Sequence, residues 1–130
     1  MATTKGNYVD GFVLVVPKKN FKQYTKMAQF GKKLWTKHGA LDYKECVGDD
    51  LVTKAMGDTK PLSFTKLTKV KPDEQVWFSF ITFKSKKHRD QVNAKVMKDS
   101  QMNDPQWKDM PMPFDMKKMA YGGFKVVVSK

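Results

Sequence analysis

Cysteine is nearly absent from this chain, and no hydrophobic run is long enough to span a membrane. The 130 residues include one cysteine, Cys46, so an internal disulfide and a two-cysteine zinc or redox motif are both excluded. A lone thiol favours a reducing compartment, and Cys46 itself is typical of a small strand residue rather than a nucleophile. The longest aliphatic run, residues 12–16, falls far short of the roughly 20 residues of a membrane helix, and residues 1–7 hold no apolar stretch of signal-peptide length. These absences predict a cytoplasmic protein with no membrane segment.

Arginine is almost missing from a strongly basic chain. The net charge is +12, yet among the 25 basic residues only Arg89 is an arginine. Arginine supplies the bidentate contacts by which proteins bind phosphates and read bases, and the lysines here are scattered without forming a block or a tail. We therefore expect no nucleic-acid partner, because that function would require a continuous basic stripe on the surface.

The sequence also lacks the short motifs of several large enzyme classes. It contains no phosphate-binding loop, dinucleotide fingerprint, nucleophile elbow or zinc-protease helix. The adjacent Asp49 and Asp50 could bind a cation, but paired aspartates are common turn formers, and no cluster of histidine or cysteine accompanies them. The residues therefore predict neither a metal site nor a cofactor.

The chain does contain a globular composition and a regular alternation of strand and helix patterns. Hydrophobic residues make up 40% and aromatic residues 12%, which fits a single domain over residues 1–130, with its core at 7–129 and a tail at 1–6. Periods of two and of 3.6 residues predict four strands and two helices. In chain order these are strand 8–16, helix 18–38, strand 40–48, strand 74–84, helix 86–99 and strand 119–129.

The two long connections, 49–73 and 100–118, carry weaker patterns. Within the first, the segment 62–70 could form a short extra strand or an ordered loop. The second is rich in proline and methionine and predicts an irregular connection. Its methionines between residues 110 and 119 could form a flexible cover over a pocket or pack as ordinary core residues.

The order β-α-β-β-α-β predicts an α+β protein of ferredoxin-like build, with an antiparallel sheet and both helices on one face. Strand 8–16 is mostly apolar on both of its faces, so the face without helices also needs cover. A second copy packed sheet against sheet would supply that cover. We therefore expect a homodimer of the dimeric α/β-barrel type.

Four segments of the chain carry a family resemblance. They are YVDGFVLVVPK (8–18), HGALDYKECVGDD (38–50), SKKHRDQVNAKVM (85–97) and MPFDMKKMAYGGF (112–124). In this order they resemble the YbaA-like bacterial family of unknown function, which is placed in the dimeric α/β-barrel superfamily. The resemblance implies the fold and the dimer but no activity, since the superfamily includes monooxygenases, haem-degrading enzymes, isomerases and stress-response proteins.

His88 and Asp10 are the candidate catalytic residues. His88 lies in the first turn of helix 86–99, on its inward side, where an imidazole could transfer protons near neutral pH or could simply bridge helix and sheet. Asp10 lies within a strand, where an unpaired carboxylate is costly to bury. It is either a base or the partner of Arg89 or of a lysine. Glu45, on a strand expected near the sheet edge, fits a solvated role.

Further residues are expected to line a ligand pocket between the helices and the sheet. These ligand-binding candidates are Trp77, Arg89, Asn93 and Tyr121. In haem-degrading members of the superfamily an asparagine, a tryptophan and a histidine frame the haem, and the resemblance would give these roles to Asn7, Trp77 and His88. Trp77 is equally suited to a core or a dimer interface.

Two functions of different classes follow. The first is binding or conversion of a small molecule in a pocket between helices and sheet, which convergent polar residues in a cavity would favour. The second is a non-catalytic accessory or stress-associated dimer, which a filled interior would favour. Haem degradation and nucleic-acid binding are weaker alternatives.

Overall fold

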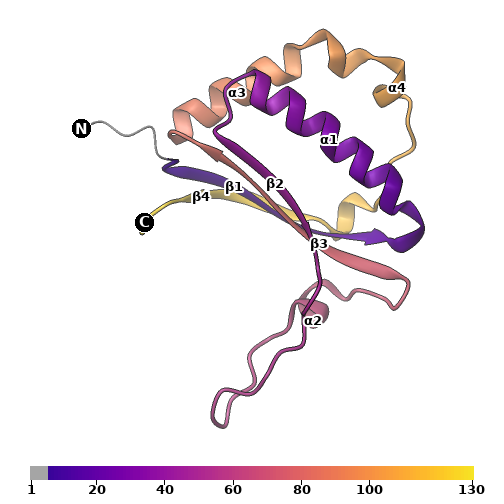
Figure 1. The fold of residues 1–130 in the computed structure, drawn as a ribbon, viewed down its shortest axis with the longest axis vertical. Helices are drawn as coiled ribbons and strands as arrows, with labels where there is room; N and C mark the ends of the chain where they lie inside the picture. The colour runs from indigo at the N-terminus through magenta and orange to yellow at the C-terminus, as the bar shows by residue number, and fades with distance from the viewer. Residues whose placement is uncertain (1–5) are drawn as a thin grey trace.

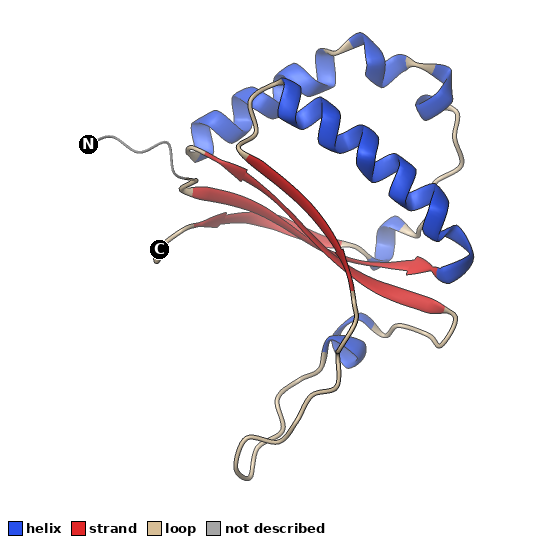
Figure 2. Cartoon of the chain, in the orientation of Figure 1, coloured by secondary structure: helices blue, strands red, loops and turns tan. Residues whose placement is uncertain are grey.

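A four-stranded antiparallel sheet carries two long helices on one face (Figures 1 and 2). The computed structural model describes residues 6–130, so the predicted tail lies outside the described residues except for Gly6. The strands stand in the order β2-β3-β1-β4, which confirms the predicted ferredoxin-like α+β fold. Their bounds are β1, Tyr8–Pro17; β2, Asp42–Val47; β3, Glu74–Phe83; and β4, Ala120–Lys125.

The two long helices are α1, Phe21–Lys37, and α3, Lys86–Lys98. Five short helical segments lie in the connections. They are η1, Lys18–Asn20; α2, Phe64–Thr68; η2, Ser100–Asn103; α4, Pro105–Lys108; and η3, Met116–Lys118. Within residues 6–130, no helix is both long enough and apolar enough to cross a membrane.

Two predicted segments take a different local structure. Segment 62–70 forms neither a strand nor only a loop, because it contains α2. The Ser63 side chain accepts a hydrogen bond from the Lys66 backbone N–H at the start of this helix, and Lys69, with a φ of 56°, ends it in the left-handed region. The last strand ends at Lys125, short of the predicted residue 129.

Glycine lets α1 lie close to the sheet. Gly31 is buried in the middle of α1, and a Cβ atom there would lie 2.7 Å from the Tyr43 hydroxyl oxygen on β2. A side chain at this position would therefore push the helix away from β2 or displace Tyr43. At the start of α3, the Ser85 side chain accepts a hydrogen bond from the His88 backbone N–H, as expected for an N-cap.

The core fills the space between the helices and the sheet in two clusters. One cluster joins α1 and α3 to the sheet through Leu34, Ile81, Phe83, Val92 and Val96. The other contains Leu14, Val16, Tyr24 and Trp77, from β1, α1 and β3. Burying aliphatic and aromatic side chains of this size contributes about 1.5–3 kcal/mol each, so the helices are held mainly by this layer.

The opposite face of the sheet is apolar and largely open. By strand alternation and register, this open face carries Val9, Val13, Phe78, Phe80 and Phe124. Phe78 is 46% exposed and Phe124 is 62% exposed. Within residues 6–130, α2 contacts β1 and β3, and on this face Val15 and Val76 are buried.

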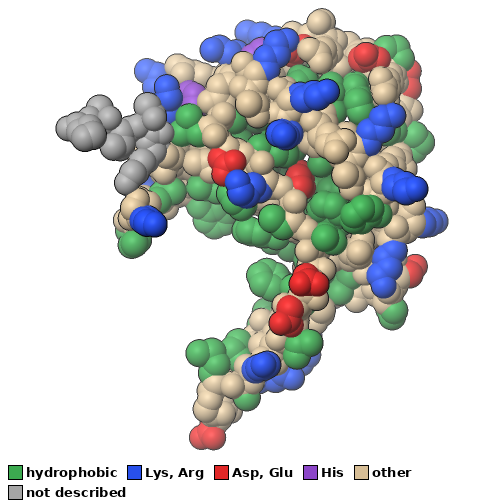
Figure 3. Space-filling view, viewed as in Figure 1, with side chains coloured by type: hydrophobic (Ala, Val, Ile, Leu, Met, Phe, Trp, Pro, Cys, Tyr) green, Lys and Arg blue, Asp and Glu red, His purple; other side chains and the backbone are tan. Residues whose placement is uncertain are grey.

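An arm formed by residues 49–63 leaves the body on the side of the sheet away from α1 and α3 (Figure 1). Backbone hydrogen bonds between Met56 and Thr59 close its tip, and Gly57 takes the positive φ of 65° that the turn requires. Val52, Met56 and Leu62 are exposed along it. Figure 3 shows hydrophobic side chains on this arm, and lysines spread over the helical layer of the same view.

A buried carboxylate ties the end of α1 to the end of α3. Asp99 Oδ2 lies 2.9 Å from Lys37 Nζ and 2.7 Å from His38 Nε2, and Asp99 Oδ1 accepts a hydrogen bond from the Gln101 backbone N–H. The hydrogen bonds from Lys37, Gln101 and His38 hold the pKa of Asp99 below its ordinary value. The ionised form of Asp99 therefore stabilises the fold.

Asp99→Asn is expected to lower the free energy of unfolding at pH 7 and to flatten its dependence on pH in acid. Because the pKa of Asp99 is lowered in the folded state, its contribution is present above about pH 4 and is lost as the pH falls further. Urea unfolding at pH 7 and at pH 3 measures both effects. Asp58→Asn, at the exposed tip of the arm, is the control, and an Asp99→Asn protein with the wild-type pH dependence would contradict this role.

Candidate functional site

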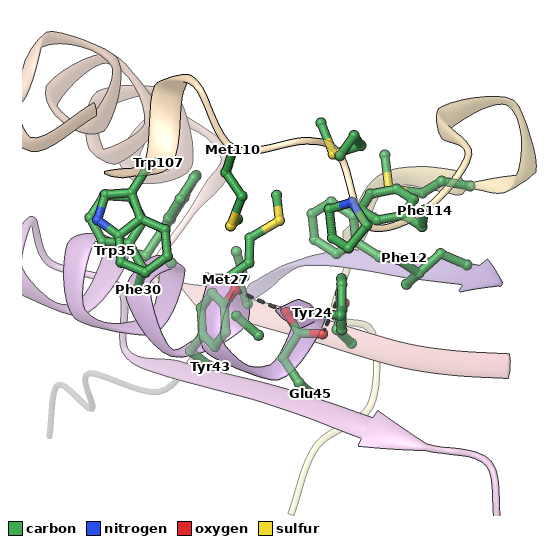
Figure 4. A pocket seen from close by; sticks show the side chains of 18 of the residues that line it. Phe12, Tyr24, Met27, Phe30, Trp35, Tyr43, Glu45, Trp107, Met110 and Phe114 are labelled. Atoms are coloured by element: carbon green, nitrogen blue, oxygen red, sulfur yellow. Dashed lines mark hydrogen bonds between the residues drawn. The ribbon is translucent and has the colours of Figure 1, made fainter. Parts of the chain in front are cut away.

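A cavity of about 420 Å³ lies between α1, the sheet and the connection 102–119 (Figure 4). Most of the side chains that line it are aromatic or are methionines. The aromatic ones are Phe12, Tyr24, Phe30, Trp35, Tyr43, Trp107 and Phe114, and the methionines are Met27, Met102, Met110, Met112 and Met119. The volume and the apolar walls are typical of a small-molecule site.

The sequence positions these walls through helix and strand periodicity. Tyr24, Met27, Ala28 and Gly31 recur at intervals of three and four residues, so they lie on the face of α1 that looks onto the sheet. The connection 102–119 packs against α1, where Trp107 stacks on Phe30 with ring centroids 4.3 Å apart. Met110, Met112 and Met119 line the cavity, so these methionines form part of its cover.

One carboxylate lies at the base of the cavity, held by two tyrosines. Glu45 Oε1 accepts a hydrogen bond of 2.8 Å from the Tyr24 hydroxyl, and Glu45 Oε2 accepts one of 2.9 Å from the Tyr43 hydroxyl (Figure 4). Burial raises the pKa of Glu45, and the hydrogen bonds from Tyr24, Tyr43 and the Ser79 side chain partly offset that rise. Burial and the Glu45 charge raise the pKa of both tyrosines, so both stay protonated and act as donors.

The solvated role expected for Glu45 is corrected by this geometry. β2 is an edge strand, as expected, but Tyr43 and Glu45 are two residues apart and share the face that α1 covers. An edge strand has a neighbouring strand on one side only, but its face can still be covered by a helix, as α1 covers β2 here. The signal that could have identified Glu45 is its spacing from Tyr43, on a face opposite the apolar stripe of α1.

Asp10, Arg89 and Asn93 come together between β1 and α3, outside the cavity. Arg89 Nη1 donates to Asp10 Oδ1 at 2.7 Å, and the Arg89 guanidinium lies 5.1 Å from the centre of the Tyr8 ring. Burial raises the pKa of Asp10, while the charge and hydrogen bond of Arg89 lower it. Asn93 Oδ1 accepts a hydrogen bond from the Trp35 indole. This pairing matches the structural alternative given above for Asp10.

His88 closes the turn between β3 and α3. Its Nδ1 accepts a hydrogen bond of 3.0 Å from the Lys84 backbone N–H. Partial burial, with the charges of Lys84 and Lys95, lowers the pKa of His88. Its ring also lies beside Phe83, with ring centroids 6.0 Å apart. These contacts are those of a histidine that joins a helix to a strand.

Trp77 and Tyr121 also lie outside the lining of the cavity. Trp77 is buried, and its ring centroid lies 4.8 Å from that of Tyr24. Tyr121 is 71% exposed and stacks on Phe12. None of the six candidate residues from the sequence is therefore among the side chains that line the cavity.

The arrangement expected for haem is not formed. His88 follows the end of β3 at Phe83, and the Asn7 backbone N–H bonds to the Phe83 carbonyl. Trp77 lies six residues earlier on β3, roughly 20 Å away along the strand. Across residues 6–130, no three histidine, cysteine, aspartate or glutamate side chains gather closely enough to hold a metal ion.

This chain is similar to one family of proteins and to one solved structure. The model described as "Protein of unknown function (DUF1428)" matches residues 7–116. The "Uncharacterized protein YbaA" of Escherichia coli (strain K12) is 38% identical over 125 residues, which cover 95% of this chain and 98% of that protein, and its Shigella flexneri namesake matches equally. A crystal structure described as a dimeric ferredoxin-like protein from an uncultured marine organism covers 95% of this chain and 99% of its own, with a TM-score of 0.58 and 8% identity. That similarity supports the fold alone.

Tyr24→Phe and Tyr43→Phe are each expected to raise the pKa of Glu45 further above its ordinary value of 4.5, because each removes a hydrogen bond that favours the ionised carboxylate. The ¹³C chemical shift of the Glu45 carboxyl, followed against pH, measures this. Tyr121→Phe, which removes an exposed hydroxyl outside the cavity, should leave the titration unchanged. An unshifted or lowered Glu45 pKa in the wild-type protein would contradict the described burial.

Proposed function

The chain belongs to the DUF1428 family of proteins of unknown function. We propose that it binds a small, largely apolar molecule in the cavity between α1, the sheet and the connection 102–119. This membership also confirms the resemblance to the YbaA-like family. The family description assigns no activity, so the proposal depends on the cavity itself. Its main support is a space of about 420 Å³ whose mostly apolar walls include one half-buried carboxylate, that of Glu45.

The size and composition of the cavity support a ligand rather than a packing defect. Ligand sites commonly span about 300–1,000 Å³ and combine apolar walls with a few fixed polar groups. Glu45 is such a group, since both of its oxygens are held in place by tyrosines. The methionines of the cover can adapt their shape to an apolar guest.

We also propose that a second copy covers the open face of the sheet. Phe78, Phe80 and Phe124 form an apolar surface there, and an exposed surface of this kind is normally buried by a partner. The similar protein from a marine organism is described as dimeric, which supports the same assembly for this chain. A sheet-to-sheet dimer leaves the cavity free, because the cavity lies on the other face.

The neutral fluorescent probe N-phenyl-1-naphthylamine is expected to bind the wild-type protein, and Ala28→Leu is expected to weaken this binding by about tenfold or more, equivalent to at least about 1.4 kcal/mol. Ala28 lines the cavity, so the larger side chain occupies space that the probe needs. Ala94→Leu makes the same replacement on the exposed side of α3 and should leave the affinity unchanged.

Equal affinities in the wild-type, Ala28→Leu and Ala94→Leu proteins would place the probe elsewhere on the surface. No binding to the wild-type protein at all would favour the alternative of a non-catalytic accessory dimer. Thermal melting confirms that each variant is folded.

Sedimentation at micromolar concentration is expected to give twice the chain mass of 15.0 kDa. Phe78→Lys places a charge at the centre of the open face and should shift the protein to the monomer, because two charges would meet in an apolar interface. Met97→Lys adds the same charge on an exposed position of α3 and should leave the dimer intact. A monomeric wild-type protein, or a dimer that tolerates Phe78→Lys, would contradict the interface.

A further inference from the structure

The half-buried carboxylate of Glu45 in the cavity has no ion-pair partner within residues 6–130. Glu45 is the acidic residue among the side chains that line the cavity. Among residues 6–130, no lysine or arginine forms an ion pair with it, although Asp10, Asp99 and Glu74 each have one. A partly desolvated carboxylate whose hydrogen-bond donors are all neutral lacks a positive charge that would offset its desolvation.

The Glu45 carboxylate also retains room for one more donor. An ionised carboxylate offers about four acceptor positions. The hydroxyls of Tyr24 and Tyr43 occupy one on each oxygen, and the Ser79 side chain supplies a third hydrogen bond. A ligand that donates a hydrogen bond can therefore bind Glu45 without displacing the tyrosines.

The walls of the cavity suit a positive charge with an apolar body. The rings of Trp35, Tyr24 and Tyr43 line it. Phe30 and Trp107 also line it, but these two rings stack on each other, and Lys26 Nζ lies 5.9 Å from the centre of the Trp107 ring. Aromatic faces attract cations by about 0.5–2 kcal/mol, and more strongly where water is excluded. The same rings and the methionines pack well against hydrocarbon, so one site offers complementary surfaces for both parts of such a molecule.

We infer that the ligand of the site proposed above is an organic cation, an apolar or aromatic molecule carrying a protonated amine, whose ammonium group binds the Glu45 carboxylate. This inference depends on the proposed binding function and specifies its ligand class. Anionic ligands are excluded because they would face Glu45 at close range. Neutral ligands leave the half-buried charge of Glu45 uncompensated.

The positive charge of the protein does not oppose this assignment strongly. The net charge of +12 is spread over a surface where interactions are screened beyond about 8 Å at physiological ionic strength. Lys108 is the basic residue of the lining, but it is exposed on α4 and keeps its hydration. The long-range field slows the arrival of a cation, while the contact with Glu45 sets its release.

Three probes that differ only in their polar end test the ligand class: 4-phenylbutylamine, 4-phenylbutan-1-ol and 4-phenylbutanoate. Isothermal titration at pH 7 should show that the amine binds at least about tenfold more tightly than the alcohol, and that the carboxylate binds most weakly. Glu45→Gln should remove the preference for the amine, so that the amine and the alcohol bind this variant with affinities within about twofold of each other. Asp42→Asn, an exposed carboxylate on the same strand, should change none of these affinities.

The order of the three probes on the wild-type protein decides the question even where Glu45→Gln folds poorly. Equal binding of the amine and the alcohol, or strongest binding of the carboxylate, overturns the cationic ligand while the apolar cavity stands as the binding site. A Glu45→Gln protein that keeps the preference for the amine also overturns it. Failure of all three probes to bind overturns both the ligand class and the proposed function.

Discussion

The hydrogen bonds from Tyr24 and Tyr43 to Glu45 are the contact on which the site depends. The bond from Tyr24 joins α1 to the edge strand β2, and the bond from Tyr43, on β2 itself, fixes the second oxygen of the half-buried carboxylate. Gly31 allows this contact, because a side chain there would meet the Tyr43 hydroxyl. Polar groups thus join α1 and β2 at Tyr24 and Glu45, and the cavity lies beside this contact. An apolar residue in place of Glu45 could pack against α1, but it would offer no hydrogen-bond acceptor to a ligand in the cavity.

The chain topology makes the two faces of the sheet different: one is covered by helices and the other exposes apolar side chains. Both crossover helices lie on one face, so that face holds the core clusters and the cavity. On the other face, within the described residues 6–130, α2 contacts β1 and β3, while Phe78 and Phe124 are exposed. The proposed ligand site and the proposed association surface therefore lie on opposite faces of the sheet and do not compete for space.

The fold could be predicted because its signals are local, whereas the site depends on contacts between distant parts of the chain. Alternation along β1 and β3 and the stripe of α1 gave the element order and one helical face. The burial of Glu45 requires α1 to lie over β2 and the connection 102–119 to cross α1, and no period in the sequence encodes either. A carboxylate within a central strand needs a partner, which predicts the pairing of Asp10 with Arg89 or a lysine, and the structure pairs it with Arg89. His88 drew attention by its chemistry, but its surroundings are those of a turn.

A crystal structure of the protein grown with N-phenyl-1-naphthylamine tests the central claim most directly. The account predicts that the probe lies between α1 and the connection 102–119, in contact with Phe30 and Trp107, and that the hydrogen bonds of Glu45 with Tyr24 and Tyr43 are retained. The account would be contradicted by a probe bound only on the open face of the sheet, with the cavity on the opposite face filled by the protein's own methionines.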